Sequence, residues 1–371
     1  MLYYRIGGGT TRYAGELCSE LLRRDDIDLR IFSLYPPEVI RALARVRGYP
    51  ESVSFHSRLP RQVRMLLWQL GALEDFGRIS SDSDLVHSPA VMVSPHGRLP
   101  IIVTVHDMTV VLFRQHHNRR TSWLFRLGLR QAIRRGATFI ASSNATASDL
   151  MRIAGVASDR VFVTPLAADS RFRPTVDPSV LSRYGLEQPY ILYVGTLEPR
   201  KGVDKLIRAF AALDASGPKL VIAGKQGWFY KDLFETVRVQ GLDSRVHFLG
   251  FVPDGDLPAL MAGAQVFVYP SAYEGFGLPV LEAMQCGTPV ITTNVSSLPE
   301  VAGEAALMVP PEDVSALTKA LRRVLDEPQL REEMRGRGLR QAAGFSWQRT
   351  AALTAEVYEH VRRRGRWRSN N

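Results

Sequence analysis

Two glutamates lie on either side of a glycine-rich turn in the stretch SAYEGFGLPVLEAMQCG. Glu274 precedes the turn, and Glu282 lies about one turn into the helix that the pattern predicts after it. The N–H groups of Phe276, Gly277 and Leu278 fall where a helix start leaves backbone donors without intrahelical acceptors. Carboxylate acceptors beside several donors suit a hydroxyl-rich ligand such as ribose or a hexose. The structural alternative is a turn followed by a helix whose early acid complements the macrodipole.

A pair of cations follows an earlier apolar run in YVGTLEPRKGVDKLI. A strand is expected to end at Gly195, and a helix to begin near Gly202 or Val203, with Arg200 and Lys201 in the loop between them. Cations beside a helix N-terminus can bind a diphosphate, because both supply positive charge and N–H donors. The alternative is a basic surface loop with a proline turn.

Three further stretches carry candidate binding residues. The glycines of IGGGTTRYAGEL, including Gly8 and Gly9, permit close backbone approach to a ligand, or they belong to a flexible N-terminus. His106 and Asp107 follow the apolar run in VTVHDMT, at the carboxyl end of an expected strand. Lys225 follows another such run in GKQGWFY. A polar residue at a strand end can equally be an ordinary structural one.

The block EGFGLPVLE, with its Glu-x7-Glu spacing, resembles the signature of the retaining family-4 glycosyltransferases, also called group 1, which have the two-domain GT-B fold. The later stretch GTPVITTNVSSLPEVAGEAALMVPPED resembles the same family. The resemblance implies that Glu274 contacts the transferred sugar, that the neighbouring amides bind its hydroxyls, and that Glu282 binds the nucleotide ribose. It also implies front-face transfer, in which the departing phosphate helps to deprotonate the acceptor.

Other stretches resemble the family in the same order along the chain. Its GIGRY loop matches the N-terminal glycines, its VHD matches the histidine–aspartate pair, and its Arg/Lys pair stabilises the leaving diphosphate. Many relatives have the arginine directly after the glycine, where this chain has Thr196, so the arginine role moves to a later position. The resemblance implies catalytic roles for Glu274, His106, Arg200 and Lys201. It implies substrate-binding roles for Gly8, Gly9, Asp107, Lys225, Phe276, Gly277, Leu278 and Glu282.

Short β-branched runs alternate with longer periodic segments in both halves of the chain, which indicates two parallel sheets with helices on both faces. The proline-rich stretch at 165–189 predicts a connection between them. We therefore expect an α/β protein of two doubly wound, Rossmann-like domains facing a cleft. Residues 1–176 form the acceptor domain and residues 177–371 the nucleotide-sugar domain, with a C-terminal helix that can pack back on the first. Ligands of such sheets bind at the carboxyl ends of the strands.

Composition narrows the classes of function. The chain of 371 residues is long enough for two domains, and its 45% apolar residues are ordinary for a globular protein. Two cysteines make a disulfide framework unexpected. There is no carboxylate motif typical of a metal site, so we expect neither metal nor cofactor. The alternatives are a sugar-nucleotide epimerase or phosphorylase on the same fold and, because net charge is +10, a basic nucleic-acid-binding protein.

The expected partners are a nucleotide-diphosphate sugar, with GDP-mannose as the first candidate, and a glycan or lipid-linked acceptor in surface polysaccharide synthesis. Nucleic acid is not expected, because basic and aromatic residues do not alternate. No signal peptide is recognised, so a cytoplasmic location is expected. Peripheral contact with an anionic membrane at the inner face is a further expectation. It rests on the amphipathic pattern of 56–73 and the basic residues of 126–135.

Overall fold

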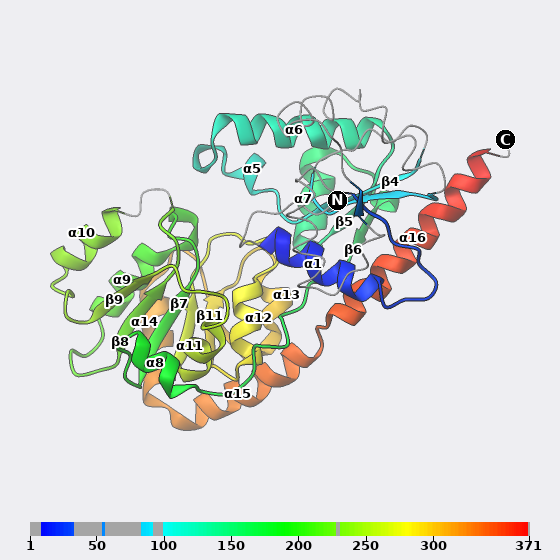
Figure 1. The fold of residues 1–371 in the computed structure, drawn as a ribbon. Helices are drawn as coiled ribbons and strands as arrows, with labels where there is room; N and C mark the ends of the chain where they lie inside the picture. The colour runs from blue at the N-terminus through cyan, green and yellow to red at the C-terminus, as the bar shows by residue number, and fades with distance from the viewer. Residues whose placement is uncertain (1–8, 33–53, 56–82, 92–98, 228–230, 370–371) are drawn as a thin grey trace. The chain divides into compact units, whose positions relative to one another are not determined.

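The computed structural model describes residues 9–32, 54–55, 83–91, 99–227 and 231–369, and the chain divides into two compact units (Figure 1). Unit 1 comprises Met1–Leu166 and Trp347–Asn371, and unit 2 comprises Ala167–Ser346. The sequence places the boundary ten residues later, inside the proline-rich connection. The C-terminal helix α16 (Trp347–Ser369) belongs to unit 1.

The described part of unit 1 contains a parallel four-stranded sheet in the order β3-β4-β5-β6. Its strands are β3 (Val86–Ser88), β4 (Ile101–Val105), β5 (Thr138–Ala141) and β6 (Val161–Val163). A separate parallel pair is formed by β1 (Ile31–Phe32) and β2 (Ser54–Phe55). Every residue of β4 is buried, as expected for a strand that is covered on both faces by helices.

Helices cover both faces of this sheet. On one face, side chains of α6 (Arg119–Arg134) and α7 (Asn144–Ala154) pack against the strands in a core that includes Leu129 and Leu150. On the other face, α16 contributes Val357 and Val361 to a smaller cluster. The remaining helical segments in the described part of unit 1 are α1 (Gly9–Leu21), α5 (Thr109–Leu112), η2 (Arg114–His116) and η3 (Ser158–Arg160).

The start of α7 differs from the sequence prediction. The sequence NATASDLMRIAG predicts a helix with Asn144 or Ser148 as its cap, but Ser143 caps the helix, because its side chain accepts a hydrogen bond from the N–H of Thr146 at 3.0 Å. Ser143 has extended backbone angles, whereas Asn144 is already helical. A capping side chain must leave the helical conformation to reach back to the third helical N–H, and only Ser143 does so.

A partly buried chain of polar contacts ties α16 and α1 to the sheet of unit 1. The imidazole of His87 lies 2.6 Å from the Tyr358 hydroxyl and 2.7 Å from Thr104, and Thr104 lies 3.0 Å from the hydroxyl of Tyr13. Burial lowers the pKa of His87 to about 3, so the ring is neutral and can both donate and accept. The C-terminal segment is therefore held to β3 and β4 by specific bonds as well as by apolar packing.

Unit 2 contains a parallel six-stranded sheet in the order β12-β11-β10-β7-β8-β9. Its strands are β7 (Tyr190–Val194), β8 (Lys219–Ala223), β9 (Val246–Gly250), β10 (Val266–Tyr269), β11 (Val290–Thr293) and β12 (Ala306–Val309). The sequence prediction missed β12, a four-residue edge strand that pairs along its whole length with β11. The prediction of two α/β domains built on parallel sheets is confirmed.

The helical segments of unit 2 follow its strands in alternation (Figure 1). They are α8 (Pro178–Arg183), η4 (Pro199–Lys201), α9 (Val203–Ala211), α10 (Lys231–Val239), α11 (Leu257–Gly263), α12 (Leu278–Gln285), α13 (Leu298–Ala302), η5 (Gly303–Ala305), α14 (Val314–Asp326) and α15 (Pro328–Ala343). The first of them, α8, lies inside the stretch that the sequence predicts only as a connection.

The strand order of unit 2 reverses between β7 and β10, since β8 and β9 lie to one side of β7 and β11 and β12 lie beyond β10. The loops that leave the carboxyl ends of these two neighbours therefore run in opposite directions. Open parallel sheets bind ligands at such a switch point, because the diverging loops leave room there. The two strongest motifs of the sequence follow β7 and β10.

Candidate functional site

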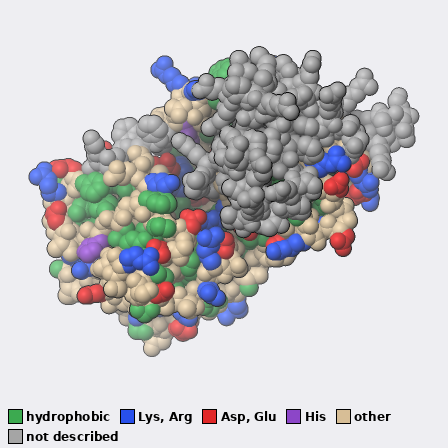
Figure 2. Space-filling view, viewed as in Figure 1, with side chains coloured by type: hydrophobic (Ala, Val, Ile, Leu, Met, Phe, Trp, Pro, Cys, Tyr) green, Lys and Arg blue, Asp and Glu red, His purple; other side chains and the backbone are tan. Residues whose placement is uncertain are grey.

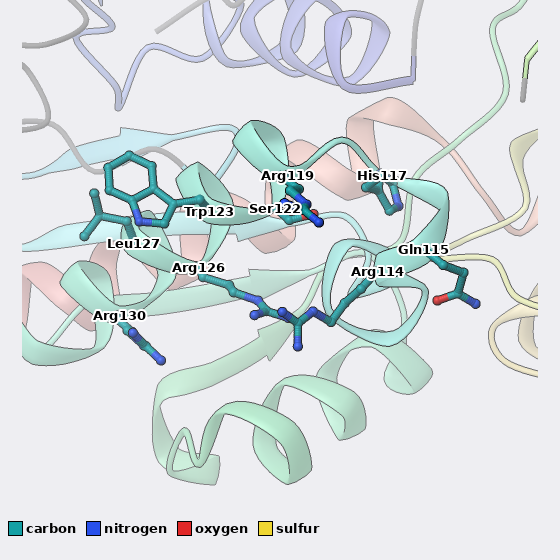
Figure 3. A pocket seen from close by; sticks show the side chains of 9 residues that line it. All are labelled: Arg114, Gln115, His117, Arg119, Ser122, Trp123, Arg126, Leu127 and Arg130. Carbon is teal, nitrogen blue, oxygen red and sulfur yellow. The ribbon is translucent and has the colours of Figure 1, made fainter.

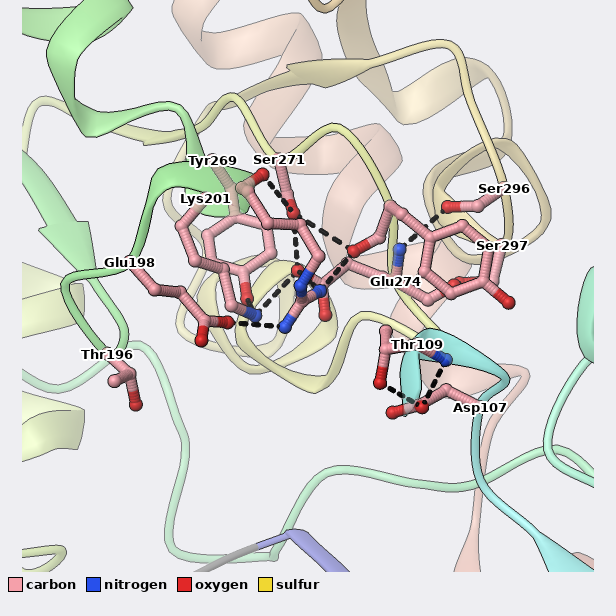
Figure 4. Close-up of polar contacts among 12 residues, drawn as sticks. Asp107, Thr109, Thr196, Glu198, Lys201, Tyr269, Ser271, Glu274, Ser296 and Ser297 are labelled. Carbon is pink, nitrogen blue, oxygen red and sulfur yellow. Dashed lines mark hydrogen bonds and ion pairs between the residues drawn. The ribbon is translucent and has the colours of Figure 1, made fainter. Parts of the chain in front are cut away.

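The carboxylate of Glu274 is the centre of a polar cluster at the carboxyl ends of β7 and β10 (Figure 4). Its Oε1 accepts hydrogen bonds from Lys201 Nζ at 2.6 Å, from the Ser271 hydroxyl at 2.6 Å and from Arg200 Nη1 at 3.4 Å. Glu274 and Lys201 are each only 9% exposed. The loop after β7 and the loop after β10 are thus joined by a buried ion pair.

The electrostatics of this pair follow from its burial. Burial alone raises the pKa of Glu274, but attraction to Lys201 and Arg200 outweighs it, so the pKa lies below its ordinary value and the carboxylate is charged. The Lys201 ammonium donates to Glu274 and, at 2.7 Å, to the Tyr269 hydroxyl. Burial raises the pKa of Tyr269 well above its ordinary value, so this phenol stays protonated.

Arg200 and Lys201 are both paired with acidic side chains, which the sequence does not predict. Arg200 forms a 2.5 Å ion pair with Glu198 and also donates to the carbonyl of Tyr273. The sequence places Arg200 and Lys201 together in a loop, and the structure turns both toward Glu274 from the short helix η4. A partly buried cation with two acidic partners is held in one geometry, which preorganises its remaining donors.

Side chains of the loop after β11 hold the backbone of the Glu274 loop in place. The Ser297 hydroxyl lies 2.9 Å from the carbonyl of Glu274 and 2.7 Å from that of Phe276, and the N–H of Glu274 donates to Ser296 at 2.9 Å. Gly277 adopts φ 108° at the start of α12, a conformation that disfavours side chains. The loop therefore turns sharply into α12 with its backbone held on one side.

The start of α12 supplies backbone donors next to this cluster. Among the described residues, the N–H groups of Phe276, Gly277 and Leu278 have no acceptor. Glu282 lies in the second turn of α12 and is 3% exposed. The structure thus brings the residues of the Glu-x7-Glu block to one end of one helix, as the sequence predicts for a site that binds hydroxyl groups.

The loop after β8 lies beside the loop after β7. Leu197 and Gln226 form a bridge between the two loops, and a Cβ at Gly224 would lie 1.8 Å from the carbonyl oxygen of Gly195. Only glycine permits this approach of the two chains. Lys225 is exposed, with its Nζ 4.5 Å from the ring centroid of Phe251.

The other candidate residues, His106, Asp107, Gly8 and Gly9, belong to unit 1. His106 follows β4, and its Nε2 lies 2.8 Å from the carbonyl oxygen of Pro89, to which it donates. The Tyr13 ring contacts the imidazole edge to face at 4.8 Å. Burial lowers the pKa of His106, so the neutral ring holds its proton on Nε2 and leaves Nδ1 as an acceptor.

Asp107 is engaged locally, since its carboxylate accepts hydrogen bonds from the N–H of Thr109 at 2.9 Å and from the Thr109 hydroxyl at 2.5 Å. Asp107 thereby holds the first residue of the short helix α5, whose N-cap is Met108. Gly9 is the first residue of α1 and is exposed. Gly8 and the segment 56–73 lie outside the described residues, so the expectations for them remain predictions.

Sequence reasoning missed the residues that position the two motifs. Glu198, Tyr269, Ser271, Ser296 and Ser297 each donate to or accept from the Glu274 loop or its cations. One local signal exists: Ser271 precedes Glu274 by three residues, a spacing at which a serine and a glutamate can bond. The others come from separate strands and loops, and no spacing in the sequence connects them.

The described residues contain neither a cluster of metal ligands nor a membrane-spanning helix. No group of three or more His, Cys, Asp or Glu side chains that could hold a metal ion occurs among them. Within the same ranges, every helix is too short or too polar to span a bilayer.

Comparison with known proteins places these observations in a family. Residues 182–341 match the family model described as glycosyl transferases group 1, and residues 7–172 match that of glycosyltransferase family 4. The chain is 34% identical over 326 residues to the O-antigen chain mannosyltransferase B of Escherichia coli, a match that covers 86% of this chain and 83% of the relative.

Two other similar proteins extend the comparison. The MMP alpha-(1->4)-mannosyltransferase of Mycolicibacterium hassiacum is 32% identical over 332 residues, covering 84% of this chain and 76% of the relative. The crystal structure of HepE from Anabaena in complex with UDP superimposes with a TM-score of 0.76 at 20% identity, covering 95% of this chain and 96% of that one. This last likeness concerns the fold, which is GT-B.

The buried ion pair predicts an acid-sensitive contribution to stability. Because the pKa of Glu274 is lowered in the folded protein, its stabilisation is present above the ordinary glutamate pKa and is lost as pH falls through the folded value. Glu274→Gln should therefore lower the free energy of unfolding by about 3 kcal/mol at neutral pH, since it leaves Lys201 unpaired. The cost should shrink only as pH falls below the ordinary glutamate pKa of about 4.3 toward the lower folded value, where the wild-type carboxylate also becomes neutral.

Urea unfolding at several pH values measures this difference. Glu235→Gln, which removes an exposed partner of Arg238, serves as a control that should change little at any pH. A cost for Glu274→Gln that is independent of pH would mean that the carboxylate is not charged in the folded protein.

Proposed function

Since the chain belongs to the group 1, or family 4, glycosyltransferases, we propose that it transfers mannose from GDP-mannose, with retention of anomeric configuration, to a glycan or lipid-linked acceptor in polysaccharide synthesis. The observation that carries the proposal is the cluster of Glu274, Lys201 and Arg200 at the switch point of unit 2. An acid and two cations at that place suit a sugar diphosphate. Mannosyl transfer rests on the names of the two relatives in Escherichia coli and Mycolicibacterium hassiacum.

The cations would bind the diphosphate of the donor. A lysine ammonium has three donors, and the described partners of Lys201, Tyr269 and Glu274, use two of them, which leaves one for a phosphate oxygen. Arg200, like Lys201, donates to Oε1 of Glu274 and adds a second positive charge beside it. The N-terminus of α9 follows directly and favours an anion. This charge would stabilise the diphosphate as it leaves.

The loop of Glu274 would bind the sugar. The three side-chain hydrogen bonds to the carboxylate from described residues all go to Oε1, so Oε2 has acceptor capacity for a sugar hydroxyl. The N–H groups of Phe276, Gly277 and Leu278 can donate to further hydroxyls. Glu282 would accept from the nucleotide ribose, and Lys225 would line the donor side of the same half-site.

Unit 1 would supply the acceptor half-site, with His106, Asp107 and the glycines at Gly8 and Gly9 nearest the reaction. The neutral imidazole of His106 would accept a hydrogen bond from a substrate hydroxyl at Nδ1, and the proton would stay on the hydroxyl oxygen. In the front-face reaction, the bond from the anomeric carbon to the phosphate oxygen breaks as the bond to the acceptor oxygen forms on the same face. The acceptor proton passes to the departing phosphate.

The family and its mannosyltransferase relatives favour transfer over the alternatives of an epimerase, a phosphorylase or a nucleic-acid-binding protein. On the face seen in Figure 2, the described Lys and Arg side chains are interspersed with Asp and Glu, without a single basic stripe that would follow a nucleic acid backbone. Peripheral docking on an anionic membrane remains part of the proposal, and within the described residues it rests on the basic surface of α6.

The test of function is a screen of nucleotide sugars. GDP-mannose should raise the thermal unfolding temperature and should release GDP in the presence of a mannose-terminated glycan. At a ligand concentration of about 100 times Kd, stabilisation should be about 2.7 kcal/mol. Stabilisation by UDP sugars alone would contradict the assignment of the donor, and the absence of stabilisation by every nucleotide sugar would contradict the donor site itself.

The two glutamates should differ in their kinetic effects. Glu274→Gln should lower kcat by about 100-fold or more, because its charge acts on the reacting sugar. Glu282→Gln should chiefly raise the KM for the donor, by about tenfold, since ribose binding is common to ground and transition states. Steady-state kinetics with Glu304→Gln, an exposed acid of the same unit, as the control measures both. Wild-type kcat in folded Glu274→Gln would refute the catalytic role.

Turnover should not require a divalent metal, because Arg200 and Lys201 supply the charge for the diphosphate. Donor turnover measured with and without a chelator should be equal within about twofold. Lys201→Ala should then abolish turnover in a way that added manganese does not restore. Complete loss of wild-type activity in the chelator, with recovery on adding manganese, would show that a metal takes this role.

A further inference from the structure

A cavity with a concentrated positive charge lies in unit 1, on elements that the donor residues of unit 2 do not include. It has a volume of about 690 Å³ and lies between η2 and the exposed side of α6 (Figure 3). The described residues of its lining include four arginines and one histidine, and none of them is acidic. The lining residues that matter here are Arg114, Arg119, Ser122, Trp123, Arg126 and Arg130.

The packing of α6 fixes which side chains face this cavity. Leu129 and Ala132 are buried in the core of unit 1, and a Cβ at Gly128 would lie 2.7 Å from the carbonyl oxygen of Val91, so the helix packs closely on that side. Its opposite face presents Arg119, Trp123, Arg126 and Arg130, which follow one another at helical spacings of four, three and four residues. The close packing of α6 therefore keeps these four side chains at the cavity.

Within the described residues, the arginines of the cavity have no acidic partners, whereas other arginines do. No described acid forms an ion pair with Arg114, Arg119, Arg126 or Arg130, whereas Arg152 on the neighbouring helix pairs with Asp149 at 2.5 Å. Arg126 and Arg130 are like charges at a four-residue spacing, which destabilises a helix. In Figure 3, the side chains of Arg114 and Arg126 point toward one another. An anion bound among these arginines would offset the repulsion between their positive charges.

Two further features of the cavity favour an anion. Arg119 is the first residue of α6, an end at which the macrodipole is already positive and acidic residues are ordinarily preferred. Ser122, in the same first turns, is 8% exposed, and its hydroxyl has no hydrogen-bond partner among the described residues. A buried hydroxyl without a partner is costly, and an oxyanion can accept from it.

We propose that this arginine cavity binds phosphate groups. Guanidinium groups bind phosphate with paired, charge-assisted hydrogen bonds, and several of them converge here around one concave space. Trp123, which is 60% exposed, and Leu127 form an apolar rim beside the arginines. Such a rim suits a phosphate that is presented by a lipid, although a free phosphate or diphosphate has the same recognition chemistry.

The inference deepens the proposed function and rests on its membrane-docking part, while its site is made by η2 and α6 in unit 1 and the donor residues lie in unit 2. It gives the expected membrane or lipid-linked acceptor a defined point of contact. Its test reads phosphate binding directly, so that it can fail while sugar transfer is confirmed, and the reverse.

The first arm of the experiment titrates pyrophosphate by calorimetry at low salt, in the presence of saturating GDP to occupy the donor half-site. The double variant Arg114→Ala/Arg126→Ala should weaken binding by about tenfold or more, since hydrogen bonds to charged groups contribute strongly. The control Arg120→Ala/Arg152→Ala removes the same charge from exposed positions of unit 1 outside the cavity, and it should change binding by less than about twofold.

The second arm measures flotation with vesicles of phosphatidylglycerol or phosphatidylcholine at low and moderate salt. If the phosphate is carried by a lipid surface, the phosphatidylglycerol vesicles should bind the wild type and not the cavity variant, and Trp123→Ala should weaken flotation without affecting pyrophosphate. If the source is a soluble phosphate, pyrophosphate should bind while neither vesicle does. Ser122→Ala should weaken whichever ligand binds, with an unchanged circular dichroism spectrum.

Equal losses in the cavity variant and in its control would show a general effect of net charge and would overturn the proposal. Absence of binding to both pyrophosphate and anionic vesicles at low salt would also overturn it. Binding of a single-stranded oligonucleotide that is lost in the cavity variant, without binding of either phosphate probe, would assign the cavity to nucleic acid instead.

Discussion

The ion pair between Lys201 and Glu274 sets the arrangement of unit 2 around its switch point. Removing two charges from water costs several kcal/mol for each ion, and their attraction offsets this only when the remaining donors and acceptors are satisfied. Ser271, Tyr269 and Arg200 provide those partners. Each comes from β10 or from the loops after β7 and β10, so the pair requires both loops in one conformation. The serines after β11 then hold the backbone of the Glu274 loop.

This arrangement prepares unit 2 for a ligand that carries both phosphate and hydroxyl groups. The cations are held by acids before any phosphate arrives, and the start of α12 leaves backbone donors without acceptors among the described residues. Preorganised donors need little rearrangement when charge develops on a leaving group. In unit 1, burial lowers the pKa of His106 and a carbonyl fixes its proton on Nε2, so Nδ1 is the ring nitrogen that can accept a hydrogen bond.

The surface of α6 follows the opposite rule. Unit 2 surrounds its site cations with Glu198 and Glu274, whereas the described lining of the α6 cavity has four arginines and no acid. An ion pair within the fold stabilises a geometry, while cations gathered without acids repel one another until an external anion binds. The two arrangements thus point to different tasks: positioning of a reacting group in unit 2, and recruitment of a phosphate-bearing ligand in unit 1.

The sequence by itself determined the architecture of parallel strands and helices and the place of each motif at a strand end, because apolar periodicity and turn residues are local signals. It identified Glu274, Lys201 and His106 as candidates from those places. It did not determine that Lys201 is buried against Glu274, that Ser297 holds the Glu274 loop, or that β12 completes the sheet. Those contacts join segments from more than twenty to about seventy residues apart, or depend on which strand lies next to which. Only the strand order of the folded sheet brings them together, since side-chain pairing over such separations leaves no periodic trace in the chain.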